Sequence, residues 1–246
     1  KFLFYAYSLT LSCLLGVFLF MSVPCFASDI SIAGFAFSGD FKTAAERFPY
    51  TFKLHKRIQS EHAAKKTFSF LVNERAKALK NPDINFRSDG SLINLKKSDR
   101  ALMTALVLTG ETVATENYGS YYKTFVNLRG DALIFDYKNQ TVVSSYPLSV
   151  VLFDATPDKP SENRITEFVE NLIRREDGRG LVTQYIRRLE SAKLPKEGTR
   201  TIQVKQGVVS PEALAFLPPS LQKNPQAMQA MLTEGFSSIL SAKLKV

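Results

Sequence analysis

Residues 121–153 read YYKTFVNLRGDALIFDYKNQTVVSSYPLSVVLF, and this stretch decides the fold. It contains two runs of β-type residues, which the polar sequence DYKNQ at 136–140 separates. Apolar side chains recur at every second position of each run, which is the period of a strand with one buried face. Asn and Asp in the polar sequence favour a tight turn. The stretch therefore predicts a long β-hairpin whose apolar face needs a covering layer.

Two residues of this hairpin predict local irregularity. Gly130 interrupts the first run and indicates a bulge or the close approach of another backbone. Pro147 has no N–H to donate to a neighbouring strand, so the second run is expected to be an edge strand or to be kinked there.

The flanking sequence predicts the rest of an α+β fold. Short apolar alternation at 30–38 and a strongly apolar run at 101–114 indicate two more strands. Helical spacing of apolar residues, with Ser161 as an N-cap, indicates the covering helices. We expect a mostly antiparallel sheet of about four strands (30–38, 101–114, 121–136, 141–153), covered by helices at 66–80, 162–175 and 180–192.

Other segments are punctuated by turn residues and prolines. Thr43 with Glu46 fits a capping box, but Pro49 lies too deep for the first turn of a helix that begins there, so the early part of the segment from Thr43 is read as a loop or a short separate helix. Residues 83–99 are expected to be a loop, 201–209 a short strand, and the sequence from Met228 a last helix. We divide the chain into an α/β domain at 28–195 and, at 196–246, a helical C-terminal extension or the start of a second α/β unit.

The N-terminus resembles an export signal. Lys1 precedes an apolar run, and the small residue Ala27 stands at the expected cleavage point, so 1–27 is read as a signal peptide. The protein is then periplasmic or secreted. The alternative is an uncleaved helical anchor, because the run at 2–20 is nearly long enough to span a bilayer. Both cysteines, Cys13 and Cys25, lie in this segment, so the exported domain is expected to have no disulfide.

Positive charge is concentrated in one segment. The chain carries a formal charge of +9, and residues 42–100 hold 14 Lys and Arg against 6 Asp and Glu. Such a field favours acidic polymers, an envelope protein or a membrane surface as partners, with nucleic acid disfavoured. The alternative is an ordinary solvated helix face. The candidate binding residues are Lys53, Lys56, Arg57, Lys65 and Lys66.

Catalytic and metal-binding motifs are sparse. His55 and His62 are seven residues apart, about 10.5 Å along a helix, which is too far for both to ligate one zinc ion easily. No nucleophile elbow occurs, and the glycines around Arg179 lack the pattern of a phosphate loop. We predict no catalytic, cofactor-binding or metal-binding residue and no cofactor. Carboxylates at the hairpin ends leave acid–base chemistry open as an alternative: Glu111, Glu116, Asp131, Asp136 and Asp154.

The order of elements resembles a known envelope module. Residues 132–150, ALIFDYKNQTVVSSYPLSV, with ISIAGFAFSG at 30–39 as first strand, are similar to the small α/β module of the Tol-system propeller protein's N-terminal domain and the curli-export lipoprotein. The chain has Asn139-Gln140 where that module has Thr-Gly in the turn, and Pro24 precedes Cys25 where a lipoprotein needs a small residue. The resemblance implies a role in envelope assembly or as an adaptor, without catalysis.

These observations favour an exported, non-enzymatic binding or adaptor protein of the bacterial cell envelope. Two alternatives stay open: an exported hydrolase that uses the hairpin-end carboxylates, and a membrane-surface or nucleic-acid binder that uses the basic segment at 42–100.

Overall fold

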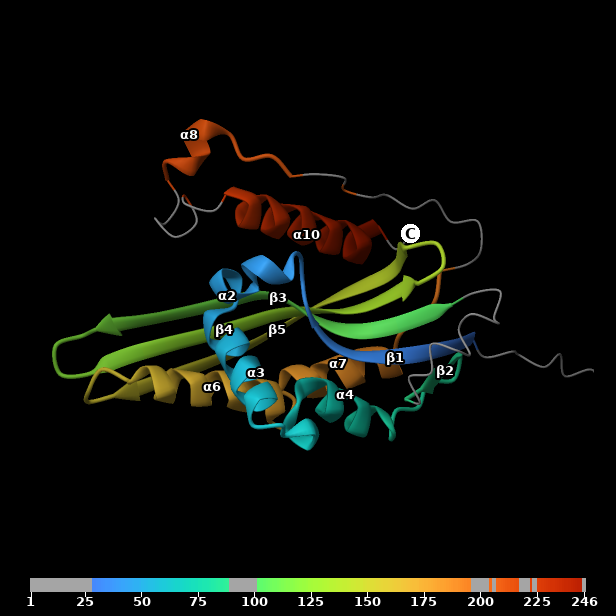
Figure 1. Cartoon of the computed structure of the whole chain (residues 1–246), viewed down its shortest axis with the longest axis horizontal. Helices are drawn as coiled ribbons and strands as arrows, with labels where there is room; N and C mark the ends of the chain where they lie inside the picture. Colours follow the sequence, from blue (N-terminus) through green and yellow to red (C-terminus); the bar gives the residue numbers. More distant parts are fainter. Residues whose placement is uncertain are drawn as a thin grey trace, which may run out of the picture.

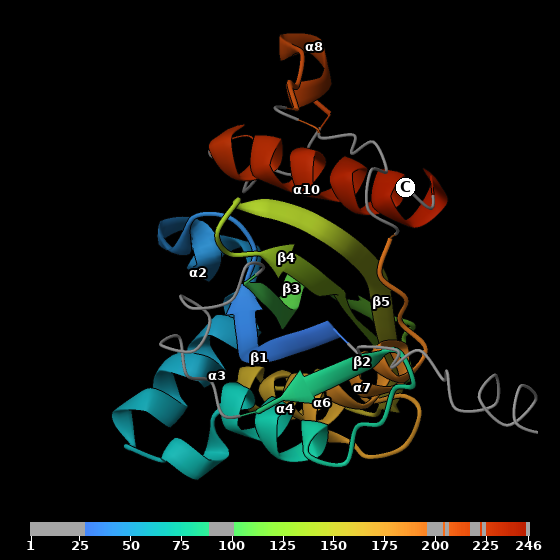
Figure 2. The same cartoon turned by 90° about the vertical axis from the view of Figure 1, so that its right-hand side faces the viewer.

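The computed structural model describes residues 28–88, 101–195, 204, 207–216, 222 and 225–244 of the 246-residue chain. They form a twisted five-stranded sheet with helices, which confirms the predicted α+β class (Figures 1 and 2). The predicted signal at 1–27 lies outside the described residues.

The sheet is mixed, with the strand order β2-β1-β3-β4-β5. β1 runs parallel to both β2 and β3, whereas β3, β4 and β5 form an antiparallel meander. The bounds are β1 Ser28–Phe37, β2 Ile84–Arg87, β3 Leu102–Asn117, β4 Tyr122–Asp136 and β5 Thr141–Thr156.

The sheet differs from the expected four mostly antiparallel strands in two respects. β2 lies inside the segment that was expected to be a loop, and β1 pairs only with parallel neighbours. The four residues of β2, INFR, are too few to display a period of two. Parallel pairing needs a long crossover, and the helical residues 41–76 supply it between β1 and β2. Alternation in a sequence reports buried faces, not the direction of the neighbouring strand.

The central hairpin forms as predicted from β4 and β5. Its turn at 137–140 is held by the carboxylate of Asp136, which accepts hydrogen bonds from the backbone N–H groups of Lys138 and Asn139 at 2.9 and 3.2 Å. Gln140 completes the turn with φ of 52°. β5 is an edge strand, as Pro147 predicts.

Gly130 marks a close approach of backbones, while the bulge lies in the neighbouring strand. The register of β3 against β4 shifts between Leu108 and Gly110, and Leu108 is the residue opposite Gly130. A Cβ atom at position 130 would lie 2.9 Å from the carbonyl oxygen of Val107. Glycine is therefore needed on the straight strand because the bulged strand presses against it.

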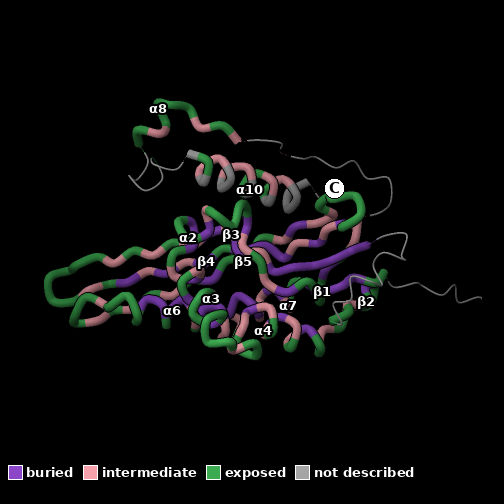
Figure 3. The backbone as a smooth tube through the Cα atoms, viewed as in Figure 1, coloured by how far each residue is buried: buried purple, intermediate pink, exposed green. Residues whose placement is uncertain are grey.

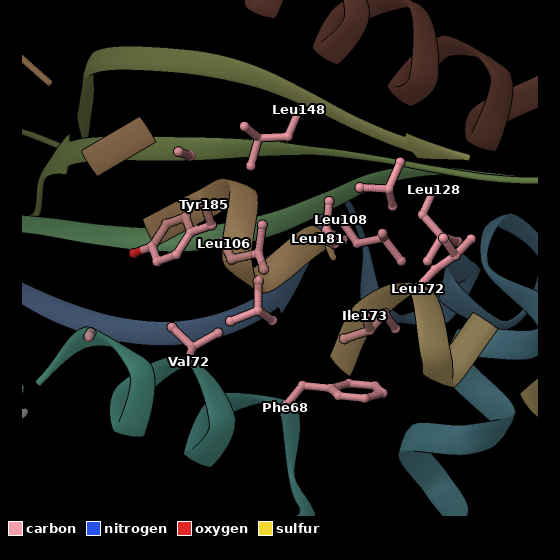
Figure 4. Close-up of a cluster of buried hydrophobic side chains, with 14 of the residues drawn as sticks. Phe68, Val72, Leu106, Leu108, Leu128, Leu148, Leu172, Ile173, Leu181 and Tyr185 are labelled. Carbon is pink, nitrogen blue, oxygen red and sulfur yellow. The ribbon is translucent and has the colours of Figure 1, made fainter. Parts of the chain in front are cut away.

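One face of the sheet is covered by a layer of helices (Figures 1 and 3). The amphipathic helices α6 and α7 place their apolar stripes on β4 and β5, and α4 packs on β1. Figure 4 shows the core between these layers, which includes the fully buried Leu106, Leu128, Leu172 and Tyr185. The helices are α2 Ala44–Arg47, α3 Pro49–Ser60, α4 Phe68–Ala76, α6 Glu162–Arg174 and α7 Leu181–Glu190, with 3₁₀ turns η1 Phe41–Thr43 and η2 Ala64–Lys66.

The start of α3 corrects the expectation for Pro49. This residue occupies the first turn of a 12-residue helix, where its missing N–H is no disadvantage. Thr43 precedes the separate helix α2, but its side chain makes no capping hydrogen bond, so the predicted capping box is wrong. Ser161 does cap α6 as predicted, and its hydroxyl accepts from the N–H of Arg164 at 3.3 Å.

α4 approaches β1 closely at Gly34. This glycine has φ of +96°, and a Cβ atom there would lie 2.9 Å from the Cβ of Ser69 on α4. The Ser69 hydroxyl also accepts a hydrogen bond of 3.2 Å from the N–H of Phe35. The missing side chain at position 34 therefore lets α4 pack closely on this face of β1.

Two polar side chains join the helices at their C-terminal ends. The Arg75 guanidinium on α4 donates to the carbonyl oxygens of Arg174 and Arg175 and to the Thr183 hydroxyl. Asn81 donates in the same way to carbonyl oxygens at the end of α7, among them that of Leu189 at 2.8 Å. These donors satisfy carbonyls that lack a partner within their own helix.

The opposite face of the sheet carries the predicted last helix, α10 (Pro225–Leu244), which contacts β5 and β3 (Figure 2). A short helix, α8 (Pro211–Leu214), precedes it. The predicted strand at 201–209 lies mostly outside the described residues, and the described residues 207–209 are not in a strand. No helix among the described residues is both long and apolar enough for a bilayer crossing.

Candidate functional site

The predicted basic residues lie on α3 and η2, and two of them pair with acids of α6. Lys53 and Arg57 of α3 form ion pairs with Glu162 and Glu170 of α6, at 2.8 and 3.4 Å. These ion pairs join two helices of the covering layer and partly neutralise the charges of Lys53 and Arg57.

The other three predicted binding residues are exposed. The Lys56 ammonium lies 5.3 Å from the ring centroid of Phe41 and 5.5 Å from that of Phe52. Lys65 and Lys66 both lie in η2, where the Lys66 ammonium is 4.0 Å from a carboxylate oxygen of Glu61. The structure thus places three of the five residues on α3 and the other two on η2.

Several other basic residues of segment 42–100 make contacts that hold the fold together. Arg47 is buried and donates to the carbonyl oxygen and hydroxyl of Ser38, and Arg75 holds the end of α6. Arg87 pairs with Asp29 across β1 and β2 at 2.6 Å. The excess charge of the segment is therefore distributed over interior contacts and several surfaces.

The two histidines occupy different environments. His55 packs edge-on against the Phe37 ring, and partial burial together with nearby Lys56 lowers its pKa. His62 adopts φ of 48° in the turn after α3. Among the described residues no group of three or more His, Cys, Asp or Glu side chains could hold a metal ion.

Glu116 and Asp136, two of the hairpin-end carboxylates, lie far apart along the sheet. In the register of β3 and β4, Glu116 stands opposite Lys123, whereas Asp136 lies 13 residues further along β4. At about 3.4 Å per residue, this separates them by roughly 44 Å. The Glu116 carboxylate accepts from the Tyr118 hydroxyl, and that of Asp136 holds the β4–β5 turn. The strands thus keep these acids in separate structural roles.

Glu111, on β3, is a partly buried member of this group of carboxylates. It accepts from the N–H groups of Tyr50 and Thr51 at 2.8 and 2.9 Å, and from the Thr51 hydroxyl. It therefore caps α3 from a strand, in place of the absent N-cap side chain. Burial raises its pKa, an effect that these three hydrogen bonds partly oppose.

The first candidate surface is aromatic and lies at the projecting end of the meander (Figure 1). Phe125 and Phe153 stand opposite each other on β4 and β5 with ring centroids 5.1 Å apart, and Phe153 is 65% exposed. Lys123 lies 5.6 Å above the Phe153 ring, and Val151 is 37% exposed beside it. We call Lys123, Phe125, Val151 and Phe153 the aromatic face.

Two tyrosines extend this surface into the β3–β4 turn. The rings of Tyr118 and Tyr121 stack with centroids 5.3 Å apart and an interplanar angle of 6°. Gly119 makes the turn with φ of 85°, and the Asn117 side chain accepts from its N–H. A rigid pair of exposed rings at a turn presents apolar area with little side-chain entropy left to lose on binding.

The second candidate surface is an open pocket of about 260 Å³ between β5 and α7. Arg187 and Arg188, in the last turn of α7, provide its positive charge. Neither forms an ion pair with a described residue. We call it the β5–α7 groove, and it is lined by Pro147, Leu148, Ser149, Gln184, Arg187, Arg188 and Ser191.

Sequence reasoning did not select either surface. The groove arginines lie outside the basic segment at 42–100, in a helix that was recognised only by its apolar stripe. Two features of the sequence point to the groove. Pro147 marks β5 as an edge strand, and the adjacent residues Arg187 and Arg188 stand at the end of α7.

Comparison with models of known protein families and with curated protein sequences returns no match for this chain.

Proposed function

We propose that this chain is a non-enzymatic binding or adaptor protein of the bacterial cell envelope, exported and acting through surface contacts with another envelope component. One observation carries the proposal: the aromatic face exposes Val151 and Phe153, which lie two residues apart and so on the same face of β5. Contiguous exposed apolar surface is a mark of interaction sites in soluble proteins.

The character of this surface favours a protein partner. Aromatic residues are enriched at protein interfaces, and the stacked Tyr118 and Tyr121 continue the apolar area to the end of the hairpin. The nearby charges are of both signs, because Glu116 of β3 stands directly opposite Lys123 of β4. A mixed rim of this kind suits a protein surface better than an anionic membrane.

The proposed location outside the cytoplasm is supported by the apolar N-terminal sequence that ends at Ala27. The resemblance of residues 132–150 to the envelope module supports an adaptor role in assembly.

Site-specific photo-cross-linking in cells of the source organism tests the proposal. A photoreactive phenylalanine analogue replaces Phe153 in one variant and Tyr137 in a matched control. Both side chains are exposed, at 65% and 52%, but they lie at opposite ends of the same hairpin. We expect a discrete adduct with an envelope protein from position 153 only. Equal labelling from both positions, or no adduct from position 153, would refute the proposed binding role of the aromatic face.

A further inference from the structure

β5 presents an open edge to solvent. It has 16 residues, and β4 is its only neighbour in the sheet that the described residues form. Among the described residues, no backbone hydrogen bond outside the β4–β5 ladder involves β5. A long edge strand with free N–H and C=O groups is a template on which another extended chain can pair.

Pro147 indicates which backbone groups face outward. Proline is tolerated in a strand where its nitrogen points to the open edge, because no ladder hydrogen bond is then lost. Alternation along the strand then directs the N–H and C=O groups of Ser149, Val151 and Phe153 outward. The segment from Pro147 to Thr156 is about 30 Å long at 3.4 Å per residue, which is enough for a strand of ordinary length.

The β5–α7 groove adds positive charge beside this edge. The Arg188 guanidinium lies 5.7 Å from the ring centroid of Tyr146, whose hydroxyl donates to the carbonyl oxygen of Lys193 at 3.0 Å. These contacts place the arginine against β5, on the side of the sheet that faces α7. Arg187 lines the same groove. The groove therefore has two exposed guanidinium groups and no acidic lining residue.

We propose that the β5–α7 groove binds an extended acidic segment of a partner protein, which adds as a strand to the open edge of β5 and places carboxylates beside Arg187 and Arg188. The inference deepens the proposed function, on which it rests, by stating the chemistry of the partner. Guanidinium groups bind carboxylates with paired hydrogen bonds, and the edge of β5 supplies the main-chain bonds.

The two faces of β5 define the pattern of the bound segment. Leu148 and Val150 point to the helical layer, and Val151 and Phe153 point to the aromatic face. Side chains of paired strands point to the same face as the residues opposite them. Acidic residues of the partner would therefore alternate with apolar ones, so that carboxylates meet the arginines and apolar groups meet Val151 and Phe153.

A labelled peptide with four Val-Glu repeats provides the probe, with fluorescence anisotropy on the full chain as the measurement. We expect binding that weakens about tenfold in the variant Arg187→Gln/Arg188→Gln, since each exposed ion pair contributes only a few-fold. Lys53→Gln/Arg164→Gln is the matched control, because it removes the same charge from paired residues on α3 and α6. The control is expected to bind as the parent does.

The variant Ser149→Pro and a block isomer of the peptide, with four Val followed by four Glu, test strand addition. Proline at position 149 removes one outward N–H and leaves the β4 ladder intact, so binding is expected to be lost while the circular dichroism spectrum is unchanged. Equal binding of the block isomer, or unchanged binding by Ser149→Pro, would show a simple polyanion site and overturn the proposal.

Two further outcomes also overturn it. A peptide with Lys in place of Glu that binds equally well would exclude the arginines from recognition. Concentration-dependent dimers that Ser149→Pro abolishes would show that a second copy of the chain occupies the edge. Because cross-linking from position 153 does not depend on Arg187 or Arg188, failure of the peptide experiment alone leaves the proposed function standing.

Discussion

Glu111 offers the sharpest test of how the fold is held together. Its carboxylate on β3 accepts the N–H groups of Tyr50 and Thr51, which begin α3 and have no acceptor within that helix. Glu111→Ala leaves both donors without this acceptor in a partly buried place. We expect a loss of about 2 kcal/mol in the free energy of unfolding, the usual scale for a lost helix cap or an unsatisfied buried polar group.

The direction of the pKa shift of Glu111 determines how the stability of the protein changes with pH. Burial raises the pKa of Glu111 in the folded protein above the unfolded value, so the folded state binds the proton more tightly. The resulting stabilisation is fully present below the unfolded pKa and is lost as the pH rises through the folded pKa. Relative to Glu111→Gln, which cannot titrate, the parent protein should therefore become less stable as the pH rises from about 4.3, the ordinary pKa of a Glu side chain.

Urea unfolding followed by circular dichroism measures both effects across this pH range. Glu116→Gln serves as the control, because the Glu116 carboxylate is exposed and, among the described residues, accepts from the Tyr118 hydroxyl alone. We expect it to change stability by less than about 0.5 kcal/mol, as for most surface substitutions. If the parent instead gains stability over Glu111→Gln as the pH rises, the hydrogen bonds outweigh burial and the assigned direction of the pKa shift is wrong.

Three substitutions test other parts of the fold by the same unfolding measurement. Arg75→Ala should lower the free energy of unfolding by about 2 kcal/mol, because carbonyl groups at the end of α6 lose a charged donor. Its control, Lys77→Ala, breaks an exposed ion pair and should change the free energy by less than about 1 kcal/mol. Equal effects would contradict the role of Arg75. Gly34→Ala should lower stability by about 1 kcal/mol or more, since its backbone has a positive φ and Ser69 occupies the space of the new Cβ; a neutral result would show that α4 moves aside. Leu128→Ala should lower it by about 2–5 kcal/mol, because the side chain is fully buried in the core, and a loss below 1 kcal/mol would place it outside that core.

The sequence predicted the meander better than the rest of the sheet, for a physical reason. β4 and β5 each bury one face, so burial leaves a period of two in the residue pattern, and Pro147 marks β5 as the edge. β2 leaves no such pattern because it has four residues, and its parallel pairing depends on a crossover whose direction the residues of β2 do not encode. α3 was missed because the side chain that caps it, Glu111, is 61 residues away in the chain.

The candidate surfaces were harder to predict because they arise from the assembled sheet. Charge counting directed attention to residues 42–100, but folding places Lys53 and Arg57 against acids of α6 and buries Arg47. Arg187 and Arg188 were not predicted to bind a partner, because they lie in a helix with charges of both signs. Folding leaves them beside the open edge of β5. Whether a cation is free to bind a partner depends on contacts between residues more than 100 positions apart.

β5 connects the two candidate surfaces, and this connection constrains any partner. β5 contributes residues to both surfaces, because Val151 and Phe153 belong to the aromatic face and Pro147, Leu148 and Ser149 line the groove. A partner that bound only the aromatic face would leave the main-chain groups of β5 hydrated, whereas a paired strand would satisfy them and reach both surfaces at once. Strand addition therefore couples the two surfaces, and substitutions at Phe153 and at Arg188 should be non-additive in peptide binding. Independent effects on the binding free energy, which add within about 0.5 kcal/mol, would mean that the two surfaces serve different partners.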